Sequence, residues 1–267
     1  MSESSPKLSI IIPAYRAAAF LQSSLEEVAA WVSSRKKQDD IEVIVVDDGS
    51  DDGTCDIVRA AMLSWPKGSE LRLLQHSENR GKGAAVRMGM LSIRGEFAIF
   101  TDADLAYGLE PVDRICDLLE QGADMACGVR LCHVGFMRRI AGMVFRQYVR
   151  LNGLGDFADP QCGIKGFRSE TAALLFGLSK VEGFAFDVEL FAMAQYQGLS
   201  VSFLPVVMRT SEQTSVRLFD QALRMARSVR EIGRWTREGA YEIPSVRTRS
   251  HKTVPEEIIS VEWLPKR

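Results

Sequence analysis

Two carboxylates, Asp102 and Asp104, follow the apolar run Phe97-Ala98-Ile99-Phe100 with one small residue between them. A strand that ends in this way holds oxygen ligands at a rigid edge. Carboxylates so close together repel each other unless they share a cation. Hard oxygen ligands suit Mg²⁺ or Mn²⁺, with diphosphate oxygens and water completing the coordination shell. The pair therefore predicts a diphosphate site, although this spacing also arises by chance in a chain with 35 acidic residues.

Two further polar stretches follow predicted strands or precede predicted helices. The acidic turn 47–54, with the sequence DDGSDDGT, offers carboxylates to a base or a ribose and glycines for tight turns. In the glycine turn Gly81-Lys82-Gly83, Lys82 would lie near an anion. This turn matches neither the P-loop nor the full dinucleotide-binding pattern. A solvated turn and a helix cap with an exposed lysine are the plainer interpretations of the two stretches.

The elements that must position these residues alternate between strand and helix patterns. This order predicts an α/β fold with a mostly parallel central sheet flanked by helices, in which ligands bind where the strands end. Strands are expected at 8–12, 41–46, 71–74, 97–101, 125–128 and 201–207. Helices are expected at 20–32, over 57–62 with Thr54 as cap, and at 84–93, 110–121, 136–151, 170–176, 186–197 and 219–235, with a loop at 157–165.

Composition limits the class of protein. The length suits one domain over 1–240, with a nucleotide-binding half at 8–130, a second half with amphipathic helices at 131–240, and a tail at 241–267. Five cysteines without a C-x-x-C pair indicate a reducing compartment, and the three histidines lack zinc-ligand spacing. A net charge of -2 provides no overall field that would recruit nucleic acid. We expect neither a secretory signal nor a transmembrane helix, because no apolar stretch approaches the ~20 residues that a span needs.

Four motifs resemble, in order and spacing, those of family 2 glycosyltransferases with the GT-A fold. They are Pro13-Ala14-Tyr15, Asp47-Asp48-Gly49-Ser50, Gly81-Lys82-Gly83 and Asp102-Ala103-Asp104. The segments 159–168 (DPQCGIKGFR) and 184–190 (FAFDVEL) are similar to the subgroup that makes dolichyl- or polyprenyl-phosphate glucose, with the phosphomannose synthases as near relatives. The resemblance covers residues 8 to about 230. It implies a GT-A-type nucleotide-diphospho-sugar transferase fold.

The resemblance also implies a role for each matching residue. The donor would be bound by Pro13, Tyr15, Asp47, Asp48, Lys82, Arg87 and Asp102, with Asp104 as the principal metal ligand beside Asp102. On the acceptor side would lie Gln161 and Lys165, and the candidate catalytic residues are Asp159, Asp187 and Glu189. Because a phosphate acceptor is already ionised, Asp159 is expected to position first and to act as a base second. Glu189 is expected to orient sugar hydroxyls.

The chain departs from the family pattern in two places. Tyr15-Arg16-Ala17 stands where the family usually has Tyr-Asn-Glu, so a carboxylate near the nucleoside is missing and the donor stays open. The Gly-Ser-Lys after the last strand is also absent. Arg209 or Arg217 would supply the positive charge instead, and an arginine fork suits phosphate.

Two helical segments carry basic residues in a pattern typical of a membrane surface. In 137–151 the arginines fall largely outside one apolar face. That face is expected at Ile140, Val144, Tyr148 and Leu151. In 217–237, arginines recur at three- and four-residue spacings that suit an anionic leaflet. An ordinary surface helix is the plainer interpretation of the first segment, and a nucleic-acid face is disfavoured because interleaved aromatic residues are missing.

The expected function is an inverting transfer of a hexose to a polyprenyl or dolichyl phosphate, with Mg²⁺ or Mn²⁺, at the cytoplasmic face of a membrane. UDP-glucose is the first donor to consider and GDP-mannose the second. A sugar-phosphate nucleotidyltransferase is a rival, but it usually has a glycine-rich basic loop where this chain has Pro13-Ala14-Tyr15-Arg16. A non-catalytic nucleotide-sugar-binding protein is the third possibility, because the Gly-Ser-Lys is missing.

Overall fold

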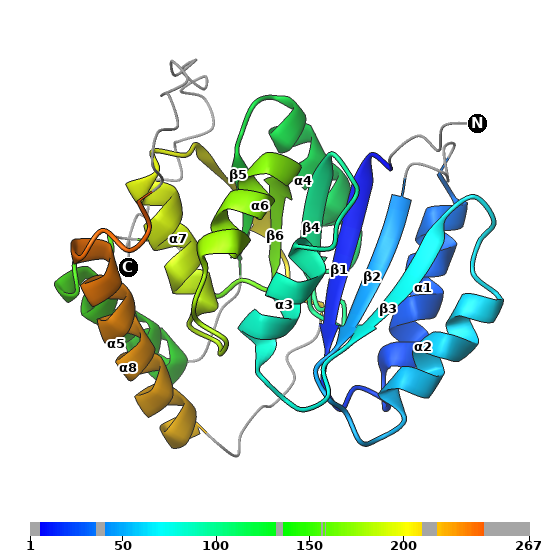
Figure 1. Cartoon of the computed structure of the whole chain (residues 1–267), viewed down its shortest axis with the longest axis horizontal. Coiled ribbons are helices and arrows are strands. Elements are labelled where there is room, and N and C mark those ends of the chain that lie inside the picture. The colour runs from blue at the N-terminus through cyan, green and yellow to red at the C-terminus, as the bar shows by residue number, and fades with distance from the viewer. Residues whose placement is uncertain are drawn as a thin grey trace.

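Strands and helices alternate along most of the chain, as an α/β fold requires (Figure 1). The computed structural model describes residues 6–35, 41–131, 136–155, 157, 159–209 and 218–242, apart from the side chains of 136–141 and 218–222. The strands are β1 Leu8–Ala14, β2 Ile41–Asp47, β3 Glu70–Gln75, β4 Phe97–Thr101, β5 Met125–Arg130, β6 Ile164–Arg168 and β7 Val201–Val206. The helices are α1 Leu21–Ser33, α2 Thr54–Leu63, α3 Lys82–Met90, α4 Glu110–Glu120, α5 Phe136–Leu151, α6 Ser169–Leu178, α7 Phe186–Tyr196 and α8 Leu218–Arg237.

The strands form one sheet in the order β3-β2-β1-β4-β6-β5-β7. Neighbouring strands are parallel, with one exception: β6 runs antiparallel to both of its neighbours, β4 and β5. Thr101, the last residue of β4, lies opposite Ile164, the first residue of β6. The start of β6 therefore lies at the same edge as the carboxyl ends of the other strands.

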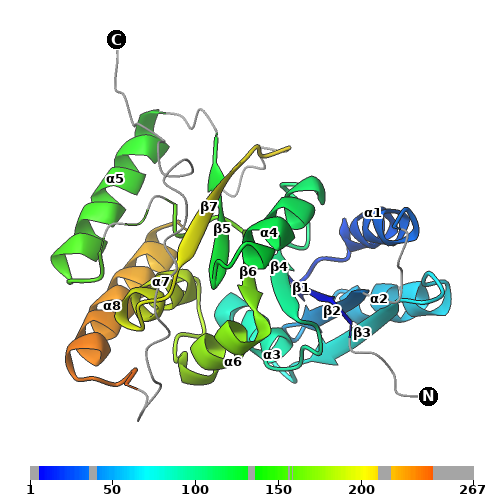
Figure 2. The same cartoon turned by 90° about the horizontal axis from the view of Figure 1, so that it is seen from above.

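Helices cover both faces of the sheet (Figure 2). One core lies beneath α1, α2 and α4, and a second lies beneath α3, α6 and α7. Their buried residues include Leu25, Val58 and Ile115 in the first core and Val86, Leu175 and Phe186 in the second. Helices α5 and α8 lie side by side at one end of the molecule, where the Tyr148 hydroxyl donates to the Ala226 carbonyl at 3.0 Å (Figure 1). In the parts of the chain that the structure describes, no helix has the length and hydropathy to cross a membrane.

Most predicted elements agree with the structure, but the loop at 157–165 is wrong at its end. Residues Ile164–Arg168 form β6, and the prediction missed it because Lys165 and Gly166 interrupt the apolar pattern. Both residues are buried nevertheless. A Cβ atom at Gly166 would lie 2.3 Å from Cγ2 of Ile115, so glycine lets α4 approach the sheet here.

Two smaller predictions are also wrong. Thr54 does not cap α2, because the preceding residue is Gly53 at φ 84° and the Thr54 Oγ1 accepts the Ala17 N–H at 3.0 Å. The predicted tail at 241–267 begins too early, since Tyr241 is fully buried. Residues 243–267 lie outside the described part of the chain.

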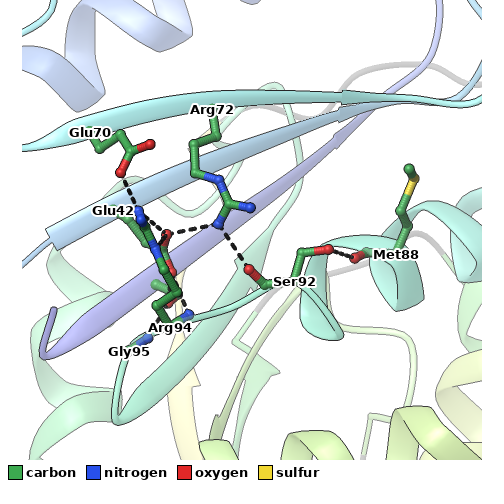
Figure 3. Close-up of polar contacts among 8 residues, drawn as sticks. Glu42, Glu70, Arg72, Met88, Ser92, Arg94 and Gly95 are labelled. Carbon is green, nitrogen blue, oxygen red and sulfur yellow. Dashed lines mark hydrogen bonds and ion pairs between the residues drawn. The ribbon is translucent and has the colours of Figure 1, made fainter. Parts of the chain in front are cut away.

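A buried carboxylate ties the opposite, amino-terminal edge of the sheet together (Figure 3). Glu42 of β2 accepts hydrogen bonds from the Ser9 hydroxyl at 2.6 Å, from the Arg94 N–H at 2.6 Å and from the Arg72 guanidinium at 3.0 Å. Burial alone would raise the pKa of the Glu42 carboxyl. The hydrogen bonds from Ser9, Arg94 and Arg72 outweigh burial and hold this pKa below its ordinary value.

Replacing Glu42 by Gln should lower the free energy of unfolding at pH 7 by about 3 kcal/mol, because it removes the buried charge that Arg72 and Arg94 pair with and places an amide among hydrogen-bond donors. A depressed pKa stabilises the fold above the unfolded value of about 4.3, and this contribution disappears as the pH falls through the folded value. Urea unfolding of both proteins from pH 7 to pH 3 should therefore show the difference shrinking with acid.

The matched control is Glu70→Gln, which removes an exposed partner of the same Arg94. This change should cost less than about 1 kcal/mol. Equal losses for the two variants would contradict the central role of Glu42.

Candidate active site at the carboxyl edge of the sheet

Asp102 and Asp104 leave the end of β4 beside Lys82, the first residue of α3. The Lys82 ammonium forms an ion pair with the Asp102 carboxylate, and one Asp104 oxygen accepts the Ala106 N–H at 3.1 Å. Burial, and then the charge of Asp102, raise the pKa of Asp104. Burial lowers the pKa of Lys82, but the charges of Asp102 and Asp187 outweigh this and raise it. One ammonium group thus faces an excess of carboxylates.

This excess of negative charge fits a divalent cation. The described residues contain no group of three or more His, Cys, Asp or Glu side chains arranged for a metal. Asp102 and Asp104 would therefore be the protein's share of the coordination shell. Mg²⁺ is commonly held in this way, by one or two carboxylates together with substrate phosphates and water.

Gly163 fixes where the Asp102 carboxylate can lie. It immediately precedes β6 and is buried. A Cβ atom at this position would lie 1.8 Å from one carboxylate oxygen of Asp102. The antiparallel β6 thus brings a residue without a side chain to the point where the candidate metal ligand needs the space.

Lys165 and Asp187 form a buried pair behind these residues. The Lys165 ammonium lies 2.6 Å from the Asp187 carboxylate and donates to the Cys162 carbonyl at 2.6 Å. Burial raises the pKa of Asp187, and the charges of Lys165 and Lys82 oppose this effect. The prediction that Lys165 lines an acceptor loop is wrong, because its side chain is fully buried in the sheet.

Asp48 shapes the glycine turn. Its carboxylate accepts the N–H groups of Arg80 at 3.0 Å and Gly81 at 2.7 Å, and it also contacts the side chains of His76 and Asn79. Asp48 is buried, so the structure gives it the role of holding the segment that leads into α3 and not that of an open nucleoside contact. The sequence could not reveal this role, because the partners lie about thirty residues further along the chain.

Asp47 is fully buried beside Asp48. One of its oxygens accepts the Ser50 N–H at 3.2 Å and the Cys55 thiol at 3.2 Å, whereas the other has no partner among the described residues. Burial, followed by the hydrogen bond to Asp47, raises the pKa of Cys55 to about 11. The thiol therefore stays protonated and donates to the carboxylate.

The end of β1 and the residues after it lie beside the acidic turn, where the Arg16 N–H donates to the Ser50 hydroxyl at 2.9 Å. Pro13 is half-buried and the Tyr15 ring is 45% exposed. Arg16 adopts a left-handed conformation with φ 49° and binds Asp51 through two contacts of 2.8 Å. The exposed aromatic ring of Tyr15 can stack on a planar base.

Arg130, for which the sequence predicted no role, holds Asp159. Its Nε and Nη2 atoms lie 2.8 and 2.7 Å from the two Asp159 carboxylate oxygens, and its backbone N–H donates to the same carboxylate at 3.1 Å. The hydrogen bond to Asp159 raises the pKa of Arg130 further. The signal that could have identified Arg130 is its position as the last residue of β5, at the same edge as the other polar strand ends.

Glu189 does not face the site as predicted. It is fully buried, and protein donors occupy both carboxylate oxygens. Gln161 is exposed and contacts the Met225 sulfur at 3.7 Å, toward α8. The prediction that Glu189 orients sugar hydroxyls is therefore wrong in this structure.

The basic residues predicted around the donor lie in different places. Arg209 pairs with Glu27 of α1 at 2.6 Å, and its guanidinium lies across Gly108, whose φ is 67°. Arg87 lies in the last turn of α3, about 7.5 Å along the axis from Lys82. Arg217 lies outside the described residues. Only Lys82 of this group contacts a candidate metal ligand among the described residues.

Replacing Gly163 by Ala should push the Asp102 carboxylate away from its place. We expect the affinity for UDP with Mn²⁺, measured by titration calorimetry, to fall at least tenfold. Gly177→Ala in α6 is the matched control, because a Cβ atom there meets nothing within 4 Å. An unchanged affinity in Gly163→Ala would contradict the placement of Asp102.

Comparison with known proteins relates this site to a family of enzymes. The family model described as glycosyl transferase family 2 matches residues 9–170. A dolichyl-phosphate beta-glucosyltransferase from Drosophila melanogaster is 36% identical, over 92% of this chain and 81% of its own length. A relative of the same name from Homo sapiens is 30% identical, over 90% and 79%.

Solved structures share the fold. Glucosyl-3-phosphoglycerate synthase from Mycobacterium tuberculosis, in complex with Mn²⁺, UDP and glucosyl-3-phosphoglycerate, has a TM-score of 0.62 and 19% identity over 90% of this chain and 81% of that chain. Mannosyl-3-phosphoglycerate synthase from Rubrobacter xylanophilus has a TM-score of 0.63 and 19% identity over 88% and 76%. The predicted GT-A fold is confirmed by these neighbours. The family model and the relatives, together with this fold, show that this chain belongs to glycosyl transferase family 2.

Proposed function

We propose that this chain transfers glucose from UDP-glucose to the phosphate of dolichyl phosphate or another polyprenyl phosphate. The names of its relatives support the sugar and the acceptor. The observation that carries the proposal is the placement of Lys82 beside Asp102 and Asp104 at the sheet edge. Such a group fits a diphosphate that arrives with a divalent cation, because the ammonium pairs with phosphate and the carboxylates with the cation.

Mg²⁺ or Mn²⁺ would be held by Asp104 and Asp102 with the donor diphosphate. The neighbour from Mycobacterium tuberculosis, which was also solved with Mg²⁺ and UDP, supports this choice. When bound, the cation offsets the negative charge that develops on the departing diphosphate. Lys82 adds a fixed positive charge to the same group, and the exposed Tyr15 ring stacks on the base.

The acceptor side is defined by Arg130 and Asp159. Arg130 keeps 30% of its side chain exposed while it binds Asp159. Its guanidinium attracts the anionic acceptor and presents one phosphate oxygen to the anomeric carbon. That oxygen is ionised at neutral pH, so no base has to remove a proton. The new C–O bond forms as the bond to the diphosphate breaks on the opposite side, which inverts the anomeric centre. Asp159 therefore orients Arg130.

The face formed by α5 and α8 supports binding to a membrane surface. Large apolar side chains are exposed at Met143, Val144, Leu151 and Leu223. Exposed arginines line α8 at Arg224, Arg227, Arg230, Arg234 and Arg237. Tyr148, predicted to share the apolar face, turns inward to Ala226, while the side chain of Ile140 lies outside the described residues. An anionic cytoplasmic leaflet would attract each arginine by roughly 1 kcal/mol.

Incubation with polyprenyl phosphate, Mn²⁺ and a panel of nucleotide sugars should yield a lipid-linked hexose from UDP-glucose. Asp104→Asn should reduce the rate at least a hundredfold, because the principal metal ligand loses its charge. If GDP-mannose were the productive donor, the transferred sugar would be mannose and not glucose. Pyrophosphate release from UTP and a sugar phosphate would indicate the rival nucleotidyltransferase, and UDP binding without any transfer would indicate a non-catalytic binder.

The double variant Arg227→Gln with Arg230→Gln should lose at least fivefold in sedimentation with vesicles that contain phosphatidylserine, and the loss should shrink at high salt. Arg59→Gln with Lys67→Gln removes the same charge from α2 and the turn after it and should leave sedimentation unchanged. Helix α2 lies at the opposite end of the molecule from α8 (Figure 1). Equal loss in both variants would point to general charge attraction and not to the α8 face.

A further inference from the structure

Glu189 lies in the first turn of α7, where its buried carboxylate collects four hydrogen bonds. It accepts the Lys180 N–H at 2.9 and 3.1 Å, the Val181 N–H at 2.9 Å and the Tyr241 hydroxyl at 2.8 Å. Burial raises the pKa of this carboxyl, and the hydrogen bonds oppose that shift. A buried carboxylate is costly unless donors surround it, so this one fixes the segment that supplies them.

The segment held by Glu189, residues 179–183 between α6 and α7, is also the support for the start of α3. The Glu182 carbonyl accepts the Ala84 N–H at 3.1 Å. A Cβ atom at Gly81 would lie 2.6 Å from the Glu182 carbonyl oxygen, and one at Gly83 would lie 2.6 Å from the Val181 carbonyl oxygen. The glycine turn around Lys82 therefore rests directly on the backbone that Glu189 holds.

Tyr241 connects this support to the end of α8. Its hydroxyl donates a hydrogen bond to Glu189, and its backbone carbonyl accepts a hydrogen bond from the Gln197 side-chain amide at 2.6 Å. The Lys180 ammonium lies 5.2 Å from the centre of the Trp235 ring and 5.6 Å from that of Tyr241. Glu189 thus fixes the backbone of Lys180, and Trp235 in α8 and Tyr241 after it fix the side chain.

We infer that Glu189 and Tyr241 are positioning residues for the donor diphosphate: they hold residues 179–183, which set the first turn of α3 and so place Lys82 opposite Asp102. The inference rests on the proposed function for the identity of the ligand. Loss of the Tyr241 hydroxyl removes one of the two donors to the Glu189 oxygen that also accepts the Lys180 N–H, and the carboxylate then holds Lys180 and Val181 less firmly. The first turn of α3 then loses its backing, and Lys82 loses its fixed place.

The test uses the full chain with Tyr241→Phe, which keeps the ring and removes the hydroxyl. The affinity for UDP with Mn²⁺, measured by calorimetry, should fall about tenfold. Hydrogen exchange of the Ala84 amide, which reports the contact with Glu182, should accelerate by a similar factor. Tyr196→Phe is the matched control, because it removes a hydroxyl that bonds Glu242 at the exposed surface nearby. That control should leave both measurements unchanged.

A residue that only stabilises the fold would lower the melting temperature and accelerate exchange of Ala84 no more than that of other core amides, without changing UDP affinity. If Tyr241→Phe gives that result, or changes nothing, the inference is overturned. Glu189→Gln is the second variant and should affect both measurements more strongly, since the amide NH2 group replaces one acceptor oxygen and faces an N–H donor. If the unaltered protein forms no lipid-linked glucose, the proposed function fails, while Ala84 exchange still decides the role of Tyr241.

Discussion

The mutual repulsion of Asp102 and Asp104 is the constraint on which the rest of the site depends. Two carboxylates at one strand end are tolerable only if positive charge is held beside them, and Lys82 supplies it. Behind Lys82 and Asp102, Lys165 and Asp187 form a second, buried ion pair. These five charged groups come from four different segments: α3, the turn after β4, β6 and α7. The relative positions of those segments are therefore tied to a balance of charge as well as to apolar packing.

Backbone contact keeps those segments in place. Gly163 lies against Asp102, and Gly81 and Gly83 lie against residues 181–182, at separations that no other residue allows. Buried carboxylates also hold these segments, by accepting hydrogen bonds from their backbone N–H groups. Asp48 holds the turn before α3, and Glu189 holds the segment beneath it. Asp48 and Glu189 are carboxylates that could have been assigned to substrate binding. In the structure they instead hold the segments that position Lys82.

The fold was largely accessible from sequence because alternating apolar segments determine where strands and helices lie. Strand 97–101 and helix 136–151 were predicted with both ends correct. β6 was missed because a buried lysine and a glycine hide its apolar character. Asp102, Asp104 and Lys82 were brought together as predicted, whereas Asp48, Lys165 and Glu189 were misjudged. A sequence shows a carboxylate or an ammonium but not the distant donors and acceptors that occupy it, and for the same reason Arg130 went unnoticed beside Asp159.

The reversed direction of β6 has a consequence for how the acceptor side is built. β5 ends and β6 begins at the same edge, so the chain between them leaves the sheet and returns to it beside the candidate active site. Arg130 at the departure and Asp159 near the return are joined by their ion pair. This ion pair ties together the two ends of a long connection that includes α5, whose Val149 is buried in the second core. The same charge pair therefore links the residues proposed to face the acceptor to the placement of α5 and of the surface proposed to meet the membrane.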